Sequence, residues 1–430
     1  MAVTDSLLAP AALLASADGS GPVPLAWGIP FAALLLAIAV LPLAAPHFWH
    51  RARNQGLVAL VCGAPVVAWA LAARPEALGH AGLEYLSFVT LLGALFTISG
   101  GVLVTGDLPA TPRVNTSLLA VGVVLANVVG TTGAAMLLVR PLLRVNAHRT
   151  KTTHNLVFFI FTVCNTGGLL TPLADPPLFL GFLQGVPFTW TLRLWPVWVG
   201  VNAVLLLVHH LLDRRAVRTE APAAIRPFGD VRAPVRLRGA WNLLLLAGVV
   251  AIVALEVATP WREVTFVALA LGSYLATPRS VHEGNAFAWG PILEVGILFA
   301  GLFAAMIPAL EALRARGPSL GVATPRAFFW ATGGLSGVLD NAPTYLAFLS
   351  VAKGLGLAPE VVGVPHDVLA AISLGAVLMG ANSYLGNGPN FMVKAIAESR
   401  GVAMPSFGGY LRWSAAVLVP LWVLLSFLVF

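Results

Sequence analysis

Charged side chains are scarce in this chain of 430 residues. Asp, Glu, Lys and Arg make up 10% of the sequence, whereas soluble proteins usually contain about 25%. Hydrophobic residues make up 58%, and the mean hydropathy is +0.87. Such a chain cannot cover a folded surface with polar groups. The composition therefore excludes a soluble globular domain and predicts an all-α polytopic membrane protein.

Cysteine and catalytic motifs are scarce as well. Cys62 and Cys164 both lie in apolar segments, at a spacing that suggests neither a disulfide nor a metal site. The sequence contains no nucleophile motif with a base and no soluble catalytic domain, so we do not expect an enzyme or a bound cofactor. The net charge of +7 comes mainly from Arg and, in a membrane protein, reports loop positions rather than nucleic-acid binding.

Apolar stretches close to the roughly 20 residues of a spanning helix run through the chain. The loop 213–238 carries seven Arg against three acids, so the positive-inside rule predicts that it is cytoplasmic in a multi-pass protein of the cell inner membrane. Residues 1–23 lack a basic segment and are interpreted as a tail rather than a signal peptide. The apolar stretches are 24–44, 56–73, 83–106, 116–143, 155–188, 190–212, 239–257, 261–276, 285–310, 327–352, 368–398 and 409–430.

The distribution of basic residues predicts that 116–143 does not cross the membrane. If every stretch spanned once, the basic loop 45–55 and the basic segment 140–154 would lie on opposite sides. Both become cytoplasmic if 116–143 enters and leaves at one face, and Gly130 and Gly133 provide a turn within the membrane. Such a re-entrant hairpin is tolerated only where it is buried in protein or lines a cavity.

The same arrangement recurs in the second half of the chain. The segment TGGLSGVLDNAPTYL predicts a second hairpin within 327–352, and Gly/Pro-rich interruptions at 165–177 and 380–390 break the two long stretches that follow the hairpins. The first interruption aligns with the second at an offset of 213 residues, and the tips align at 210. The sequence thus predicts two repeats, 24–212 and 239–430, joined by the linker 213–238.

These repeats are expected to have inverted topology, with about 10 spanning helices, two re-entrant hairpins (116–143 and 327–352) and two broken helices (155–188 and 368–398). The first repeat starts outside and the second inside, which is an architecture of secondary transporters with sites near the midplane. Inverted repeats with broken helices favour alternating access over a channel.

Oxygen-bearing and amide side chains gather at the two tips and the two breaks, and such groups replace the hydration water of an alkali cation. Soft ligands and His clusters are absent from these motifs, so a transition metal is not expected. Asp340, Asn341, Asn127 and Thr131 are the candidate Na+ ligands. The full set of candidate ion- or substrate-binding residues is Asn127, Thr131, Thr132, Asn165, Thr166, Thr171, Asp175, Asp340, Asn341, Thr344, Asn382, Ser383, Asn387, Asn390 and Lys394.

Intramembrane carboxylates are costly to bury and therefore indicate function. Asp340 is interpreted as a cation ligand or proton carrier, although a structural cap at the hairpin turn is the alternative. Asp175 is the second candidate, and its alternative is a cap on a half-helix that starts at Pro176. Lys394 balances Asp340 in one interpretation and extends to the cytoplasmic face in the other.

The hairpins with Asn/Thr tips, each followed by a broken helix, resemble the ion transporter superfamily. Its members include divalent-anion/sodium symporters, citrate–metal transporters, arsenite-efflux permeases and NhaD-like sodium/proton antiporters. GGLLTPLADPP and VLDNAPT are most similar to the NhaD-like and citrate-transporter-like branch. The tips here depart from the Ser-Asn-Thr of dicarboxylate symporters. The resemblance implies sodium sites at Asn127–Thr132, Asp340–Thr344, 165–175 and 382–390, and a homodimer with a scaffold and an elevator-like mobile domain.

The first functional hypothesis is sodium (cation)/proton antiport, with Na+ and H+ competing for Asp340 or, second, Asp175. The alternative is sodium- or proton-coupled transport of citrate, a dicarboxylate or an oxyanion such as arsenite, with Lys394 and the asparagines forming an anion pocket. The expected partners are an inorganic cation, a proton, a small organic anion and the lipid bilayer, without nucleic acid.

Overall fold

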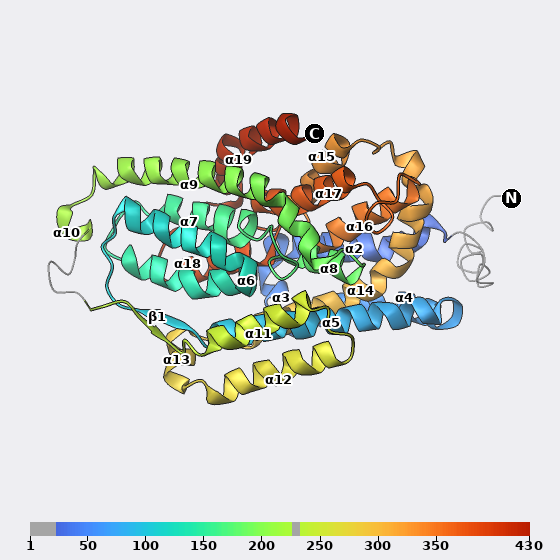
Figure 1. Cartoon of the computed structure of the whole chain (residues 1–430), viewed down its shortest axis with the longest axis horizontal. Helices are drawn as coiled ribbons and strands as arrows, with labels where there is room; N and C mark the ends of the chain where they lie inside the picture. Colours follow the sequence, from blue (N-terminus) through green and yellow to red (C-terminus); the bar gives the residue numbers. More distant parts are fainter. Residues whose placement is uncertain (1–22, 226–232) are drawn as a thin grey trace.

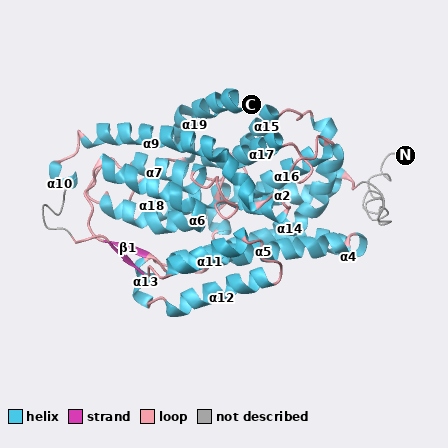
Figure 2. Ribbon diagram, viewed as in Figure 1, coloured by secondary structure: helices cyan, strands magenta, loops and turns pink. Residues whose placement is uncertain are grey.

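The computed structural model describes residues 23–225 and 233–430, and most of its helices lie along the long axis of the molecule (Figures 1 and 2). Within these residues, seven helices are long and apolar enough to cross a membrane. The protein is therefore an all-α polytopic membrane protein, as its composition predicts. The expected tail 1–23 lies outside the described residues except for Val23, and so does part of the linker, 226–232.

The helices of the first half begin near the described start of the chain and end before the linker. They are η1 (Leu25–Gly28), α2 (Ile29–Ala44), α3 (Pro46–Trp49), α4 (Ala52–Ala73), α5 (Pro75–Gly100), α6 (Pro112–Val145), α7 (Thr153–Phe161), the π-helix η2 (Thr162–Thr166), α8 (Pro176–Leu183), η3 (Phe188–Leu194) and α9 (Trp195–Val217).

The linker and the second half contain the remaining helices. They are α10 (Pro222–Ile225), α11 (Asn242–Ala254), α12 (Trp261–Ala276), α13 (Arg279–Gly284), α14 (Gly290–Arg316), η4 (Gly317–Leu320), α15 (Pro325–Ser336), α16 (Asn341–Gly354), α17 (His366–Met379), η5 (Gly380–Asn382), α18 (Gly388–Ser399) and α19 (Phe407–Val429).

A two-stranded antiparallel sheet joins the end of α5 to the linker, and the sequence did not indicate it. Strand β1 (Leu103–Thr105) pairs with β2 (Arg236–Arg238). The expectation of one apolar helix over 83–106 is wrong at its end, because α5 stops at Gly100. Asn242 Nδ2 donates to the Gly101 carbonyl at 2.8 Å, and Asn285 Nδ2 donates to those of Gly100 and Val102. These side chains satisfy acceptors that a helix end leaves free.

The first hairpin is formed by α6, which folds back at Gly130. The φ of Gly130 is 77° and its ψ is 158°, a combination that glycine adopts and other residues avoid. Asn115 and Asn146 exchange two side-chain hydrogen bonds, of 3.1 and 2.8 Å. In a straight helix these residues, 31 positions apart, would lie about 46 Å from each other. The segment therefore enters and leaves at the same end of the molecule.

The second hairpin and both broken helices are also present. Helices α15 and α16 lie antiparallel across the tip 337–340, with the rings of Phe328 and Phe348 6.5 Å apart. Non-helical segments separate η2 from α8 and η5 from α18. Prolines stand in the first turns of α8 and α18, where a missing N–H costs nothing. The first broken helix ends at Leu183, earlier than the expected 188.

Contacts at the two ends of the molecule show that α5 and α14, which the predicted repeats pair with each other, run in opposite directions. At one end, here called the basic end, Arg149 meets Asp213 at 2.6 Å, and β1 at the end of α5 meets β2. At the other end, here called the distal end, Arg74 before α5 meets Glu311 near the end of α14. Thus α5 runs toward the basic end, and its counterpart α14 runs away from it. The repeat bounds 24–212 and 239–430 and the cytoplasmic position of the basic end stay predictions.

Candidate functional site

The two tips and the two breaks meet at the carboxylate of Asp175, which is 1% exposed. Its Oδ1 accepts hydrogen bonds from Thr131 Oγ1 and Asn387 Nδ2, each at 2.9 Å, and its Oδ2 accepts one from Asn341 Nδ2 at 2.6 Å. Thr131 belongs to the first tip, Asn341 to the second tip and Asn387 to the second break. All three donors are uncharged and buried, so the carboxylate has partners but no ion pair among them.

The Asp175 side chain does not cap the helix that follows it. Asp175 is the N-cap residue of α8, yet its side chain makes no capping hydrogen bond, and both of its oxygens accept from side chains of other segments. The interpretation of this side chain as a helix cap is therefore wrong. At Asp340 the alternative interpretation is correct, since its Oδ1 accepts the N–H of Ala342 at 3.0 Å and caps α16.

Four half-helices begin around Asp175. The second limb of α6 begins at Thr131, α8 at Pro176, α16 at Asn341 and α18 at Gly388. A helix N-terminus carries a partial positive charge and unpaired N–H groups, and both favour an anion. The arrangement therefore surrounds one buried carboxylate with groups that stabilise negative charge, in a part of the fold where ions bind in transporters with broken helices.

Asparagines join the two breaks to each other. Asn165 Nδ2 donates to Asn390 Oδ1 at 2.7 Å, and Asn387 Nδ2 lies 3.3 Å from Asn165 Oδ1. Asn390 Nδ2 donates to the carbonyls of Gly380 and Ser383. These bonds satisfy backbone acceptors that the second break exposes. Asn165, Asn387 and Asn390 therefore hold the two repeats together beside Asp175.

Asn127 and Thr171 hold the first tip against the first break. Asn127 Oδ1 accepts the N–H of Leu170 at 2.8 Å, and Thr171 Oγ1 donates to the Asn127 carbonyl at 2.6 Å. Thr166, in contrast, bonds to Asn202 of α9. The predicted Na+ ligand Asn127 thus uses its side-chain oxygen for a backbone N–H in this conformation.

Several predicted site residues face elsewhere. Asn382 Oδ1 accepts from Trp422 of α19 at 2.9 Å, Ser383 Oγ caps a local turn, and Thr344 Oγ1 donates to the Asp340 carbonyl. Lys394 pairs with Glu398 at 2.7 Å. The interpretation of Lys394 as the partner of Asp340 is therefore wrong, because one turn of helix supplies a nearer carboxylate.

A cavity of about 30 Å³ lies beside Asp175, between α5 and the first tip and break. Thr131, Thr132 and Leu95 are among the residues that line it. A water molecule needs about 10–15 Å³ of such space, so the cavity has room for one or two water-sized species. Nearby, Oδ1 of the fully buried Asn341 has no hydrogen-bond partner. The site therefore has a small space and a spare acceptor next to a carboxylate.

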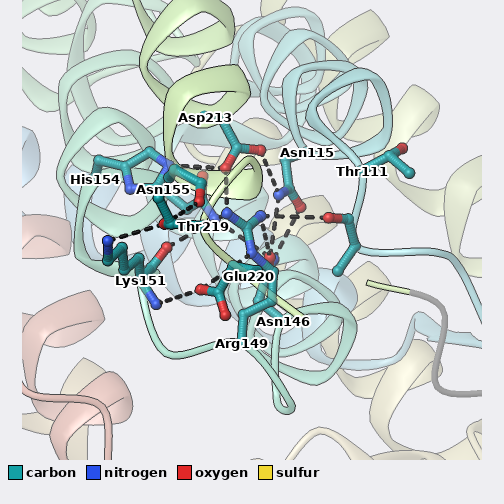
Figure 3. Close-up of polar contacts among 12 residues, drawn as sticks. Thr111, Asn115, Asn146, Arg149, Lys151, His154, Asn155, Asp213, Thr219 and Glu220 are labelled. Carbon is teal, nitrogen blue, oxygen red and sulfur yellow. Dashed lines mark hydrogen bonds and ion pairs between the residues drawn. The ribbon is translucent and has the colours of Figure 1, made fainter. Parts of the chain in front are cut away.

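A second buried polar cluster lies at the basic end, and sequence reasoning missed it (Figure 3). The Asp213 carboxylate accepts from Arg149 Nη2 at 2.6 Å, Asn115 Nδ2 at 2.8 Å and, at 2.9 Å, bonds to His154 Nε2. The side chains of Arg149 and Asp213 are both 0% exposed. Their positions in basic loops indicated solvent-exposed charges, and only the hairpin's return beside α9 buries them.

The spacing of three side chains in this cluster would suit a metal ion. Ligand atoms of His154, His209 and Asp213 lie within 4.8 Å of one another. Arg149 contacts the same Asp213 oxygen as His154, and its positive charge opposes a cation there. His209 is buried and bonds to Asn155 at 2.9 Å. We interpret the cluster as structural.

The fold defines a class of protein, a polytopic membrane protein with two hairpins and two broken helices around a buried carboxylate, an arrangement found in secondary transporters. A family model described as putative citrate transport matches residues 20–430. The match covers nearly the whole chain, and the protein belongs to this family of transporters. A comparison with curated proteins finds no match.

Proposed function

We propose that this protein is a secondary transporter that couples a cation, H+ or Na+, to the movement of a citrate-class anion, with Asp175 as the coupling carboxylate. The observation that carries the proposal is the meeting of Thr131, Asn341 and Asn387 on Asp175. Sequence reasoning ranked Asp340 above Asp175. We rank Asp175 first, because Asp340 caps α16 whereas Asp175 accepts hydrogen bonds from Asn341 and Asn387 of the second half.

The coupling follows from charge. An ionised Asp175 attracts a cation, and the cavity beside it has room for a small one. A cation bound there neutralises the carboxylate and alters the hydrogen bonds that reach it from both hairpins. Loading of the site thereby changes the contacts between repeats, which is the differential interaction that alternating access requires.

The anion is assigned from the family and from the half-helix termini. The family description names citrate transport, and carboxylates bind favourably at helix N-termini. A citrate-class anion carries more than one negative charge, so neutralisation of Asp175 by the coupling cation lowers its repulsion from the site.

Cation/proton antiport without an anion is the second candidate. This candidate is favoured because no Lys or Arg is found among the described residues that donate hydrogen bonds to Asp175. Such a site attracts a cation more readily than a multiply charged anion.

Purified protein in liposomes distinguishes these functions. We expect labelled citrate to accumulate in response to an inward H+ or Na+ gradient. If Na+, Li+ or K+ gradients instead move protons without citrate, as read by an internal pH dye, the protein is an antiporter. The absence of both citrate uptake and proton movement in preparations of folded protein would contradict the proposal.

A further inference from the structure

Helices α11 and α12 are shorter than the segments that match them in the first repeat. The sequence indicated a 19-residue stretch at 239–257, but α11 contains 13 residues and α12 contains 16. Their counterparts in the first repeat are the segments Leu25–Ala44, with 20 residues, and Ala52–Ala73, with 22. The two repeats therefore differ in the length of membrane that they can cross.

The α11–α12 pair presents apolar side chains outward. Leu244 is 75% exposed, Leu255 is 77% exposed and Leu275 is 80% exposed. Figure 1 shows α12 along the lower edge of the molecule, outside α11 and α5. In a membrane protein, such a face contacts acyl chains.

Aromatic and charged residues mark both ends of this apolar face. Trp241 precedes α11 at the basic end. Trp261, which is 69% exposed, begins α12 at the opposite end of the pair, where Glu263 accepts a hydrogen bond from Ser87 in the middle of α5. Exposed Glu256 stands in the turn between α11 and α12, and exposed Arg238 and Arg279 flank the pair at the basic end. Trp and charged residues at these positions are typical of the boundary between hydrocarbon and headgroups.

The spacing of the two boundaries is short for a bilayer. Thirteen residues of α11 span about 20 Å, at about 1.5 Å for each residue, whereas the hydrocarbon core is about 30 Å thick. Tilt only reduces the thickness that a helix covers, so it cannot remove the difference. A short apolar face is accommodated when the adjoining bilayer becomes thinner.

We propose that the α11–α12 pair is a lipid-facing surface that binds a locally thinned bilayer, with a hydrocarbon layer near 20 Å at this face. Its partner is the phospholipid bilayer, and short acyl chains fit it best. The surface belongs to one side of the protein only, since the segment Leu25–Ala44, α4 and α5 are long enough to cross an ordinary bilayer. This inference is independent of the transported ion.

Depth-resolved quenching of tryptophan tests the proposal on the full chain in long-chain phosphatidylcholine liposomes. Brominated lipids carry the quencher either near the headgroups or deep in the core, and the signals of Trp241 and Trp261 are obtained by difference from Trp241→Phe and Trp261→Phe. We expect shallow bromines to quench both residues more strongly than deep ones. Stronger quenching of either residue by deep bromines overturns the proposal, because the bilayer then keeps its thickness. Protection of both residues from either lipid also overturns it and assigns the face to a second protein copy.

A substitution provides a second readout. Glu256→Leu removes the charge of the turn between α11 and α12 and lengthens the apolar face. In liposomes with a series of acyl lengths, we expect the length that gives the highest thermal unfolding midpoint to increase in this variant. Glu76→Leu is the matched control, because Glu76 is an exposed acid at the distal start of the 26-residue α5, and it should leave the optimum unchanged. Equal optima for wild type and Glu256→Leu contradict the proposal.

Discussion

Asn341 Nδ2 donates a hydrogen bond to Asp175 Oδ2 at 2.6 Å, and this contact joins residues 166 positions apart in the chain. Asn341 is the first residue of α16 and Asp175 directly precedes α8, so the bond connects the two repeats. A change in the charge of Asp175 therefore acts directly on the second hairpin. This relationship makes Asp175, rather than Asp340, the center of the functional account.

Gly130→Ala should destabilise the first hairpin. The residue holds a φ of 77° and a ψ of 158°, and an added Cβ would lie 3.2 Å from the Leu173 carbonyl oxygen. Backbone strain of this kind costs about 1–3 kcal/mol, so the thermal unfolding midpoint in detergent should fall. Gly272→Ala is the control, because Gly272 lies within α12 and has no atom within 4 Å of its Cβ position. A midpoint for Gly130→Ala that equals the wild-type value would contradict the hairpin geometry.

Asp213→Asn should be strongly destabilising because it removes the nearer of the two carboxylates that pair with the buried charge of Arg149, at 2.6 Å, and leaves only Glu220 at 4.0 Å. Loss of one member of a buried ion pair costs about 3–5 kcal/mol. The double variant Asp213→Leu with Arg149→Met should recover much of the lost stability, since both charges are absent. Denaturation of the purified variants provides the comparison. A double variant less stable than Asp213→Asn would show that the pair itself, rather than an unpaired charge, determines the loss.

The hydrogen bonds of Glu220 should make part of the stability depend on pH. Burial raises the pKa of Glu220, but the N–H groups of Lys151 and Thr150 outweigh it and lower the pKa below its ordinary value. A lowered pKa in the folded state means that the contribution is present above the ordinary value and is lost as the pH falls. Glu220→Gln should thus lower the unfolding midpoint at neutral pH and match wild type in acid. Glu283→Gln, which changes an exposed acid on α13, is the control substitution.

The sequence predicted the order of the elements well because charge, glycine and proline act locally. Arg distribution required a re-entrant segment, and Gly130 marked its tip. The contacts that determine which carboxylate matters could not be predicted in this way. Asp175 and Asp340 both precede half-helices, and only tertiary packing decides that one caps its helix and the other meets Asn341.

The cluster around Asp213 also could not be predicted from local sequence, because its burial depends on tertiary packing. In sequence, Asp213 and Arg149 belong to basic loops and indicate solvated charge. The return of α6 brings Asn115 and Asn146 together and encloses both charges. Strand β2 likewise forms by pairing with β1, which is distant in the chain, so no local sequence pattern predicts it.

Ion-coupled transport by Asp175→Asn and Asp340→Asn, compared in the same liposomes, tests the central claim most directly. The amide at 340 retains the cap of α16, because Asn is as good an N-cap residue as Asp, whereas the amide at 175 carries no charge for a cation. We predict that Asp175→Asn loses cation-driven citrate uptake and proton movement while it remains folded, and that Asp340→Asn keeps them. Retained coupling in Asp175→Asn, or its loss in Asp340→Asn alone, would contradict the account.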